Sequence, residues 1–278
     1  MKKFRLQLLS GLLIASVFMA SCVKEETENP VVDQKLMIAS AEIDFTNEAD
    51  FNLGNDVASE NSSYSSRGSD NLGRFPDCAT VTVNNTTPGV FPKVITIDFG
   101  TVGCLYNNIT RTGVLTITLS GYLMNNGSVM TIERSNYYVN GRHVEGTVTY
   151  VNETTNPETP QWNRTITNGR ITNLAGEVFT HSGTRTVKMV EGISTLALGD
   201  NVYHILSGTH TVHRPNGTSL TVTVLETLVK RYACNYISQG KLILDGTYLD
   251  GVLDYGTGTC DNQATYTHSN GQTYAVNL

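Results

Sequence analysis

This sequence of 278 residues lacks most of the local motifs by which enzymes are recognised. Charged residues make up only 16% of it, tryptophan occurs once, and there is no HExxH, no GxSxG and no glycine-rich phosphate loop. Its six histidines do not have the spacing of a local metal site, so we expect them at the surface, with no metal and no cofactor. The sequence therefore contains none of these common motifs for metal-dependent, acyl-transfer or nucleotide chemistry.

An excess of positive charge is also missing. The formal net charge is −6, with 12 acidic and 4 basic residues in the segment 22–77, and 13 acidic and 12 basic residues in the segment 78–278. The second segment therefore lacks the basic face that nucleic acids require, and no nucleic-acid partner is expected. The acidic first segment is expected to stand off an anionic membrane surface.

The N-terminal residues predict export. Lys2, Lys3 and Arg5 precede an apolar segment at 8–19 that is too short to span a bilayer. The tetrapeptide Met19-Ala20-Ser21-Cys22 then resembles a bacterial lipobox, which implies lipidation of Cys22 and a membrane partner through that lipid. An ordinary secretory signal or an uncleaved anchor are the alternatives.

The residues after this cysteine bear on which side of the outer membrane the protein faces. Lys24-Glu25-Glu26 resembles the surface-export signal of Bacteroidetes lipoproteins, which implies display on the cell surface. The alternative is an acidic, solvated tether on a protein that faces the periplasm.

One motif occurs twice, as Asp98-Phe-Gly-Thr-Val-Gly-Cys104 and as Asp254-Tyr-Gly-Thr-Gly-Thr-Cys260. Each copy follows another cysteine by 26 residues, namely Cys78 and Cys234. An antiparallel hairpin brings its two ends together, which favours the local disulfides Cys78–Cys104 and Cys234–Cys260, although four cysteines allow three connectivities. We interpret Asp98 and Asp254 as turn-capping carboxylates, not as metal ligands or catalytic groups. Disulfides agree with an oxidising compartment.

Residues 75–278 predict an all-β domain. Apolar residues alternate with threonine in several segments, including 115–120, 144–150 and 220–228. Five Asn-Gly pairs, which begin at residues 126, 140, 168, 216 and 270, predict hairpin turns. We therefore expect an antiparallel β-meander of about 12–13 strands, in two layers or in one curled sheet.

The segment 22–74 is predicted to be an acidic tether between the signal peptide, residues 1–21, and the β domain. Apolar positions from Leu36 to Val57 favour one or two short amphipathic helices. Asp44, Glu48 and Asp50 are expected on their solvent side. Serine-rich residues 59–70 have the composition of a flexible linker.

Several phrases resemble an uncharacterised family of Bacteroidetes lipoproteins over residues 75–278. They are Val94-Ile-Thr-Ile-Asp-Phe-Gly-Thr101, Ser135-Asn-Tyr-Tyr-Val-Asn-Gly141 with Val144-Glu145-Gly146, Leu253-Asp-Tyr-Gly-Thr257 and Gly258-Thr-Cys-Asp-Asn262. The resemblance implies a lipid-anchored all-β protein of the outer membrane. It implies no activity.

The side chains that suggest a ligand are aromatic. Tyr137, Tyr138 and Trp162 are candidates for a platform on which a sugar or peptide stacks, with ordinary strand packing as the alternative. We expect a non-enzymatic, lipid-anchored module that binds a glycan or a protein, or that is purely structural. The alternative is an envelope hydrolase of the glycosidase type, whose carboxylates, from among Glu133, Glu145, Glu177, Glu191 and Glu226, converge only in the fold.

Overall fold

The computed structural model describes residues 33–63, 78–195 and 198–278. The chain divides into two units, Met1–Val31 and Val32–Leu278, and the described residues all belong to the second. Cys22, Lys24, Glu25 and Glu26 therefore lie outside the described residues. Within the described ranges, no helix combines the length and the apolar character needed to cross a membrane.

The described part of the folded unit is dominated by antiparallel strands, as predicted, and it contains 14 of them where about 12–13 were expected. One long helix, α1 (Gln34–Ser63), precedes them, and a short 3₁₀ helix, η1 (Leu198–Asp200), precedes β9. The strands are β1 (Thr80–Val83), β2 (Lys93–Asp98), β3 (Cys104–Tyr106), β4 (Ile109–Leu119), β5 (Val129–Val139), β6 (Arg142–Asn152), β7 (Gln161–Thr172), β8 (Val178–Glu191), β9 (Val202–His213), β10 (Ser219–Arg231), β11 (Gln239–Gly246), β12 (Leu249–Thr257), β13 (Gln263–His268) and β14 (Thr273–Asn277).

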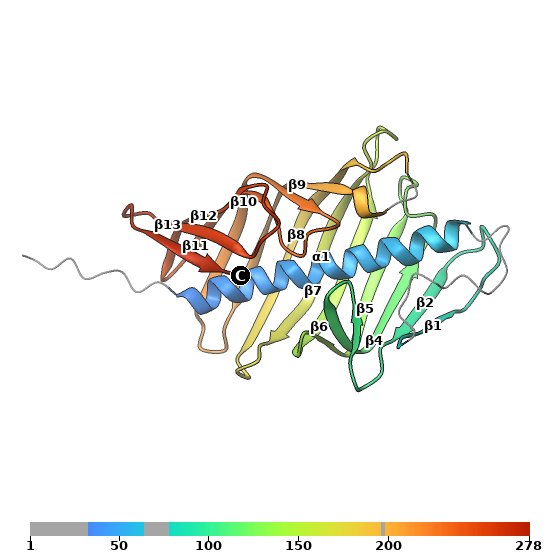
Figure 1. Cartoon of the computed structure of the whole chain (residues 1–278), viewed down its shortest axis with the longest axis horizontal. Helices are drawn as coiled ribbons and strands as arrows, with labels where there is room; N and C mark the ends of the chain where they lie inside the picture. Colours follow the sequence, from blue (N-terminus) through green and yellow to red (C-terminus); the bar gives the residue numbers. More distant parts are fainter. Residues whose placement is uncertain (1–32, 64–77, 196–197) are drawn as a thin grey trace, which may run out of the picture. The chain divides into compact units, whose positions relative to one another are not determined.

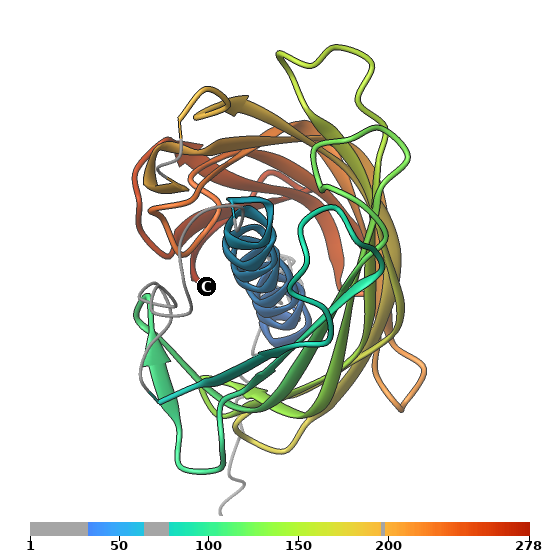
Figure 2. The same cartoon turned by 90° about the vertical axis from the view of Figure 1, so that its right-hand side faces the viewer.

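The strands form a single sheet in the order of the chain. Each strand pairs with the next along the path from β1 to β14, except that β3 lies off the path and pairs with β4. The sheet curls around α1 without closing, and Figure 2 shows the helix inside the curl, viewed along its axis. Of the two expected arrangements, the curled sheet is the correct one.

Four of the five Asn-Gly pairs lie between strands, as predicted. Asn140 and Gly141 form the two-residue turn between β5 and β6, with φ angles of 48° and 80°. Asn168-Gly169 is the exception, because it lies within β7 at a shift of register. A Cβ atom on Gly169 would lie 2.4 Å from the ring of His181, so this glycine serves a bulge where two strands approach closely.

The disulfides confirm the favoured pairing. Cys78–Cys104 joins the two ends of the β1–β2 hairpin, and Cys234–Cys260 flanks the β11–β12 hairpin in the same way. The aspartates of the repeat are turn caps: the backbone N–H of Gly100 donates to Asp98 Oδ1 over 2.8 Å, and that of Gly256 donates to Asp254 Oδ1 over 2.8 Å. Each bridge is expected to add about 2–4 kcal/mol to the free energy of unfolding.

The N-terminal segment is helical, as predicted, but the prediction of short helices with a solvent side is wrong. One helix of 30 residues takes the place of short helices, and none of its residues from 36 to 58 is exposed. The sheet curls around α1 and covers more than one of its sides, as Figure 1 and Figure 2 show, so polar as well as apolar residues become buried. The folded unit therefore begins with α1, and not near residue 75.

Candidate functional site

The acidic residues of α1 form a buried charge network with arginines of the sheet. Arg134 Nη2 lies 2.7 Å from Asp50 Oδ2, Arg164 Nη1 lies 2.5 Å from Glu48 Oε1, and Arg185 Nη2 lies 3.0 Å from Asp44 Oδ2. All six side chains are at most 3% exposed. The expectation that these acids face solvent is wrong, because inward-facing arginines on β5, β7 and β8 supply their counter-charges.

One histidine, His210, extends this network, and a second, His181, is buried near it. His210 Nδ1 lies 2.8 Å from Arg185 Nη2, and its Nε2 lies 2.9 Å from Ser40 Oγ. Because an arginine only donates, Nδ1 of His210 accepts and Nε2 carries the proton. His181 is also buried, so the expectation of surface histidines is wrong for these two.

Both imidazoles are held neutral. Burial first, and then nearby His210 and Arg134, lower the pKa of His181 to about 3 against the opposing charge of Asp44. Burial, followed by the charges of Arg185 and Arg164, lowers the pKa of His210 well below its usual range. The folded unit therefore resists protonation at two positions that take up protons freely in the unfolded chain.

We expect the free energy of unfolding to fall as the pH decreases from 6.5 to 5. In this range the unfolded chain binds protons on His181 and His210 and the folded unit does not, so each contributes a slope of about 1.4 kcal/mol per pH unit. Urea unfolding at several pH values measures the slope. His181→Gln should reduce it, and the same change at exposed His213 should leave it unchanged. A flat profile in the wild type would contradict the buried, neutral imidazoles.

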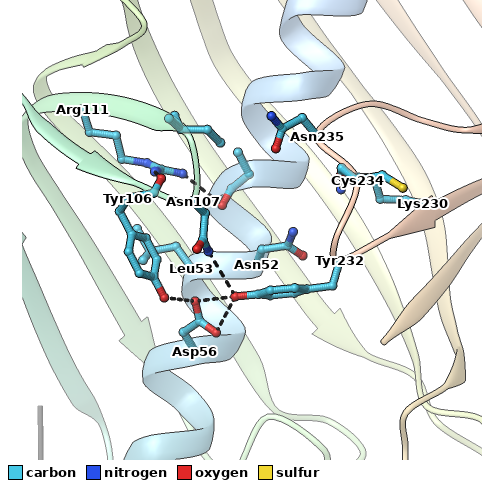
Figure 3. A pocket seen from close by; sticks show the side chains of 12 residues that line it. Asn52, Leu53, Asp56, Tyr106, Asn107, Arg111, Lys230, Tyr232, Cys234 and Asn235 are labelled. Carbon is cyan, nitrogen blue, oxygen red and sulfur yellow. Dashed lines mark hydrogen bonds between the residues drawn. The ribbon is translucent and has the colours of Figure 1, made fainter. Parts of the chain in front are cut away.

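A cavity of about 30 Å³ lies beside α1, where residues 106–111 approach residues 230–235. We call this place the seam. Asp56 of the helix accepts hydrogen bonds there from Tyr106 Oη over 3.2 Å and from Tyr232 Oη over 3.0 Å (Figure 3). Asn107 Nδ2 donates to Tyr232 Oη over 3.4 Å. The two sides of the seam are thus joined directly and through the helix.

The electrostatics keep both phenols protonated. Burial and the charge of Asp56 raise the pKa of Tyr106 to about 12 and raise that of Tyr232 further. A second cavity, of about 10 Å³, lies nearby against Asp44, Glu48 and Lys230. A water-sized position takes about 10–15 Å³, so the two cavities hold about two waters and one water. Neither has the volume of an ordinary substrate pocket.

Comparisons with protein-family models, curated proteins and solved structures found no match. The site is therefore interpreted from its own residues. Groups of three or more His, Cys, Asp or Glu side chains that could hold a metal are absent from the described ranges.

The predicted aromatic platform is not formed. Tyr137 and Trp162 are fully buried in the core, where Trp162 Nε1 donates to the carbonyl of Leu123 over 3.2 Å. Tyr138 is half-buried and stacks on His143, with ring centroids 4.6 Å apart. Tyr137 and Tyr138 are adjacent in one strand, so they point to opposite faces of the sheet.

The glutamates considered for hydrolysis are dispersed among separate ion pairs. Glu145 pairs with Arg170 over 2.9 Å, Glu177 with Lys35 over 2.7 Å, and Glu226 with Lys241 over 2.9 Å. Glu133 and Glu191 are exposed and line neither cavity. The arrangement of these five residues does not provide two carboxylates across a shared cleft, which glycoside hydrolysis needs.

A row of threonines crosses the outer, convex face of the sheet. Strand register places one threonine opposite the next on seven consecutive strands, β4 to β10. The row consists of Thr118, Thr131, Thr149, Thr165, Thr184, Thr209 and Thr223. All seven are half-buried or exposed. Neighbouring strands lie about 4.8 Å apart, so the hydroxyl groups form a regular, uncharged line.

Proposed function

We propose that the protein is a lipid-anchored protein of the bacterial outer membrane whose folded unit acts as a non-enzymatic binding module for a weakly charged glycan. The observation that carries this proposal is that α1 fills the concave face of the sheet. The convex face is then the extended surface that remains for contact, and the threonine row crosses its middle.

The chemistry of this row supports a glycan more than a protein ligand. A threonine hydroxyl both donates and accepts a hydrogen bond, as do the hydroxyls of a sugar, and its methyl group offers a small apolar contact. The row itself contains no charge. Protein interfaces are instead enriched in aromatic side chains and arginine at their centre, which this row lacks.

Binding of the purified chain to neutral and acidic polysaccharides tests the proposal. The double substitution Thr165→Lys with Thr184→Lys should abolish binding, because it places two charged side chains at the centre of the row. Thr101→Lys with Thr155→Lys is the matched control, because both residues are exposed in loops and the charge change is equal. Equal loss in both variants, or binding only to proteins, would refute a glycan surface on the convex face.

Location is tested separately by protease digestion of intact cells. The proposed lipid anchor at Cys22 and the signal at Lys24, Glu25 and Glu26 predict digestion of the wild type. They also predict protection of the variant with Glu25→Ala and Glu26→Ala. Protection of both proteins would place the folded unit in the periplasm and turn the search for ligands to envelope components.

A further inference from the structure

Two buried cations line the seam cavity from opposite sides. Arg111 of β4 and Lys230 of β10 are each 2% exposed, and Figure 3 places them on either side of the cavity. They come from strands that are far apart in the sheet order. The cavity thus brings together two positive charges that no hairpin would bring together.

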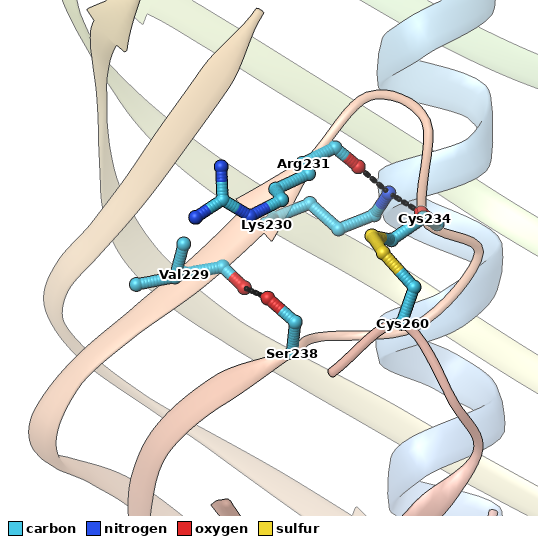
Figure 4. Close-up of a disulfide and its surroundings, with 6 residues drawn as sticks. All are labelled: Val229, Lys230, Arg231, Cys234, Ser238 and Cys260. Carbon is cyan, nitrogen blue, oxygen red and sulfur yellow. Dashed lines mark hydrogen bonds between the residues drawn. A yellow bond between two sulfur atoms is a disulfide. The ribbon is translucent and has the colours of Figure 1, made fainter. Parts of the chain in front are cut away.

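The hydrogen-bond acceptors of both cations are neutral oxygen atoms, and Arg111 also lies over the Phe99 ring, 5.9 Å from its centroid. Arg111 donates from Nε to Tyr137 Oη over 3.0 Å, and its two other hydrogen bonds, to the carbonyls of Tyr106 and Ala49, are long, at 3.4 and 3.5 Å. Lys230 Nζ donates to the carbonyls of Arg231, over 2.8 Å, and of Cys234, beside the Cys234–Cys260 disulfide (Figure 4). Across the described ranges, neither cation has a carboxylate oxygen within 4.0 Å, unlike Arg134, Arg164 and Arg185.

A buried charge without a counter-ion is costly, and natural proteins normally pair it. Among the residues that the structure describes, the wall of the cavity contains one carboxylate, Asp56, which already accepts hydrogen bonds from two phenols. One acid against two cations leaves this described part of the wall with an excess of one positive charge. The amides of Asn52 and Asn235 also line the cavity and add N–H donors.

We propose that the seam cavity binds a single carboxylate group, which supplies the negative charge that Arg111 and Lys230 lack. The size of the cavity limits the anion. About 30 Å³ accommodates about two water-sized positions, which matches the two oxygens of a carboxylate and is too small for the four oxygens of sulfate or phosphate. Exposed Asn235 lies in the wall, so the cavity opens to solvent on that side. This site is separate from the convex face and does not depend on the glycan proposal.

Binding is expected to weaken at alkaline pH. Burial lowers the pKa of Lys230 to about 8, against the opposing charge of Glu48 on α1. Among the described residues, the other charged or titratable groups in the cavity wall are Asp56, Arg111, Tyr106 and Tyr232, and both phenols keep their protons at this pH because their pKa values are raised. A bound carboxylate favours the charged lysine, so affinity should be full below pH 8 and decline above pH 8.

The experiment titrates the purified full chain with ¹³C-labelled formate and acetate at constant ionic strength, with NMR line broadening as the readout. We expect saturable binding in the wild type and at least a tenfold loss of affinity in Lys230→Met. Lys241→Met is the matched control, because this lysine is 33% exposed, lies outside the cavity and pairs with Glu226, and it should bind as the wild type does. Glucuronate and a peptide with a free C-terminus distinguish a carboxylate carried on a glycan from one carried on a protein.

Two results would overturn the carboxylate site. One is the absence of saturable binding of formate and acetate to the wild type, which needs no variant and is decisive even if Lys230→Met fails to fold. The other is equal binding of sulfate or phosphate, since the cavity would then not select by size. Neither result touches the test with Thr165 and Thr184, so the two proposals fail independently.

Discussion

Replacing Glu48 with alanine is expected to lower the free energy of unfolding by about 3–5 kcal/mol, because it leaves Arg164 buried without its close partner. Arg164 is 1% exposed, and its next carboxylate oxygen, Asp44 Oδ1, lies 3.9 Å away. Arginine is effectively always protonated in proteins, so in the variant the Arg164 side chain cannot avoid the loss of Glu48 by losing a proton. Urea unfolding of the wild type and the variant measures the difference.

An exposed ion pair provides the control. Glu226 and Lys241 are 55% and 33% exposed, so Glu226→Ala should cost no more than about 1 kcal/mol. The double variant with Glu48→Leu and Arg164→Leu should be more stable than Glu48→Ala, since it buries no unpaired charge. If Glu48→Ala and Glu226→Ala cost the same, α1 does not lie within the sheet.

The strands and turns were predictable because their signals are local. Threonine alternates with apolar residues along single strands, and Asn140-Gly141 has the positive φ angles that a tight hairpin turn requires. Cysteines at the two ends of one hairpin must meet, which made the disulfides accessible to the same reasoning. The prediction of a hairpin turn at Asn168-Gly169 is wrong. A β-bulge there also places the asparagine in the left-handed conformation, while strand pairing continues on both sides of it.

The solvent side of the helix was predicted wrongly. An apolar stripe separates a buried side from a solvent side only when one side of the helix contacts the protein. The sheet curls around α1, so Asp44, Glu48 and Asp50 become interior residues. The sequence of the strands did contain an indication that acidic residues are buried. Arg164 occupies an inward position in β7 between buried Trp162 and Ile166, where a cation demands a buried partner.

The seam could not be derived from the sequence. Asp56, Tyr106 and Tyr232 lie 50 and 126 residues apart, and only the curl of the whole sheet brings them together. The aromatic platform, in contrast, could have been excluded in part. Tyr137 and Tyr138 are neighbours within one strand, and the two-residue period of a strand sends their rings to opposite faces.

Replacing Phe51 with alanine is expected to cost about 3–5 kcal/mol, which tests directly whether α1 belongs to the core. The Phe51 ring is fully buried among three aromatic rings of the sheet, with centroid distances of 4.5 Å to Tyr150, 5.8 Å to Trp162 and 5.3 Å to Tyr203. These rings belong to β6, β7 and β9. Since β9 pairs with neither β6 nor β7, Phe51 connects strands that are not adjacent in the sheet. Removing it opens a cavity that several strands would have to fill.

Phe45 provides a matched control on the same helix. It is half-buried and stacks on one ring, Tyr236, at 5.3 Å, so Phe45→Ala should cost less than half as much. If α1 were a solvent-exposed tether, both substitutions would leave the free energy of unfolding nearly unchanged, because a phenylalanine in solvent contributes little to folding. A large loss at Phe51 together with a small loss at Phe45 would establish that the curled sheet requires its own helix as the core. Truncation before residue 75 would then remove the centre of the fold, and any binding assay must use a chain that retains α1.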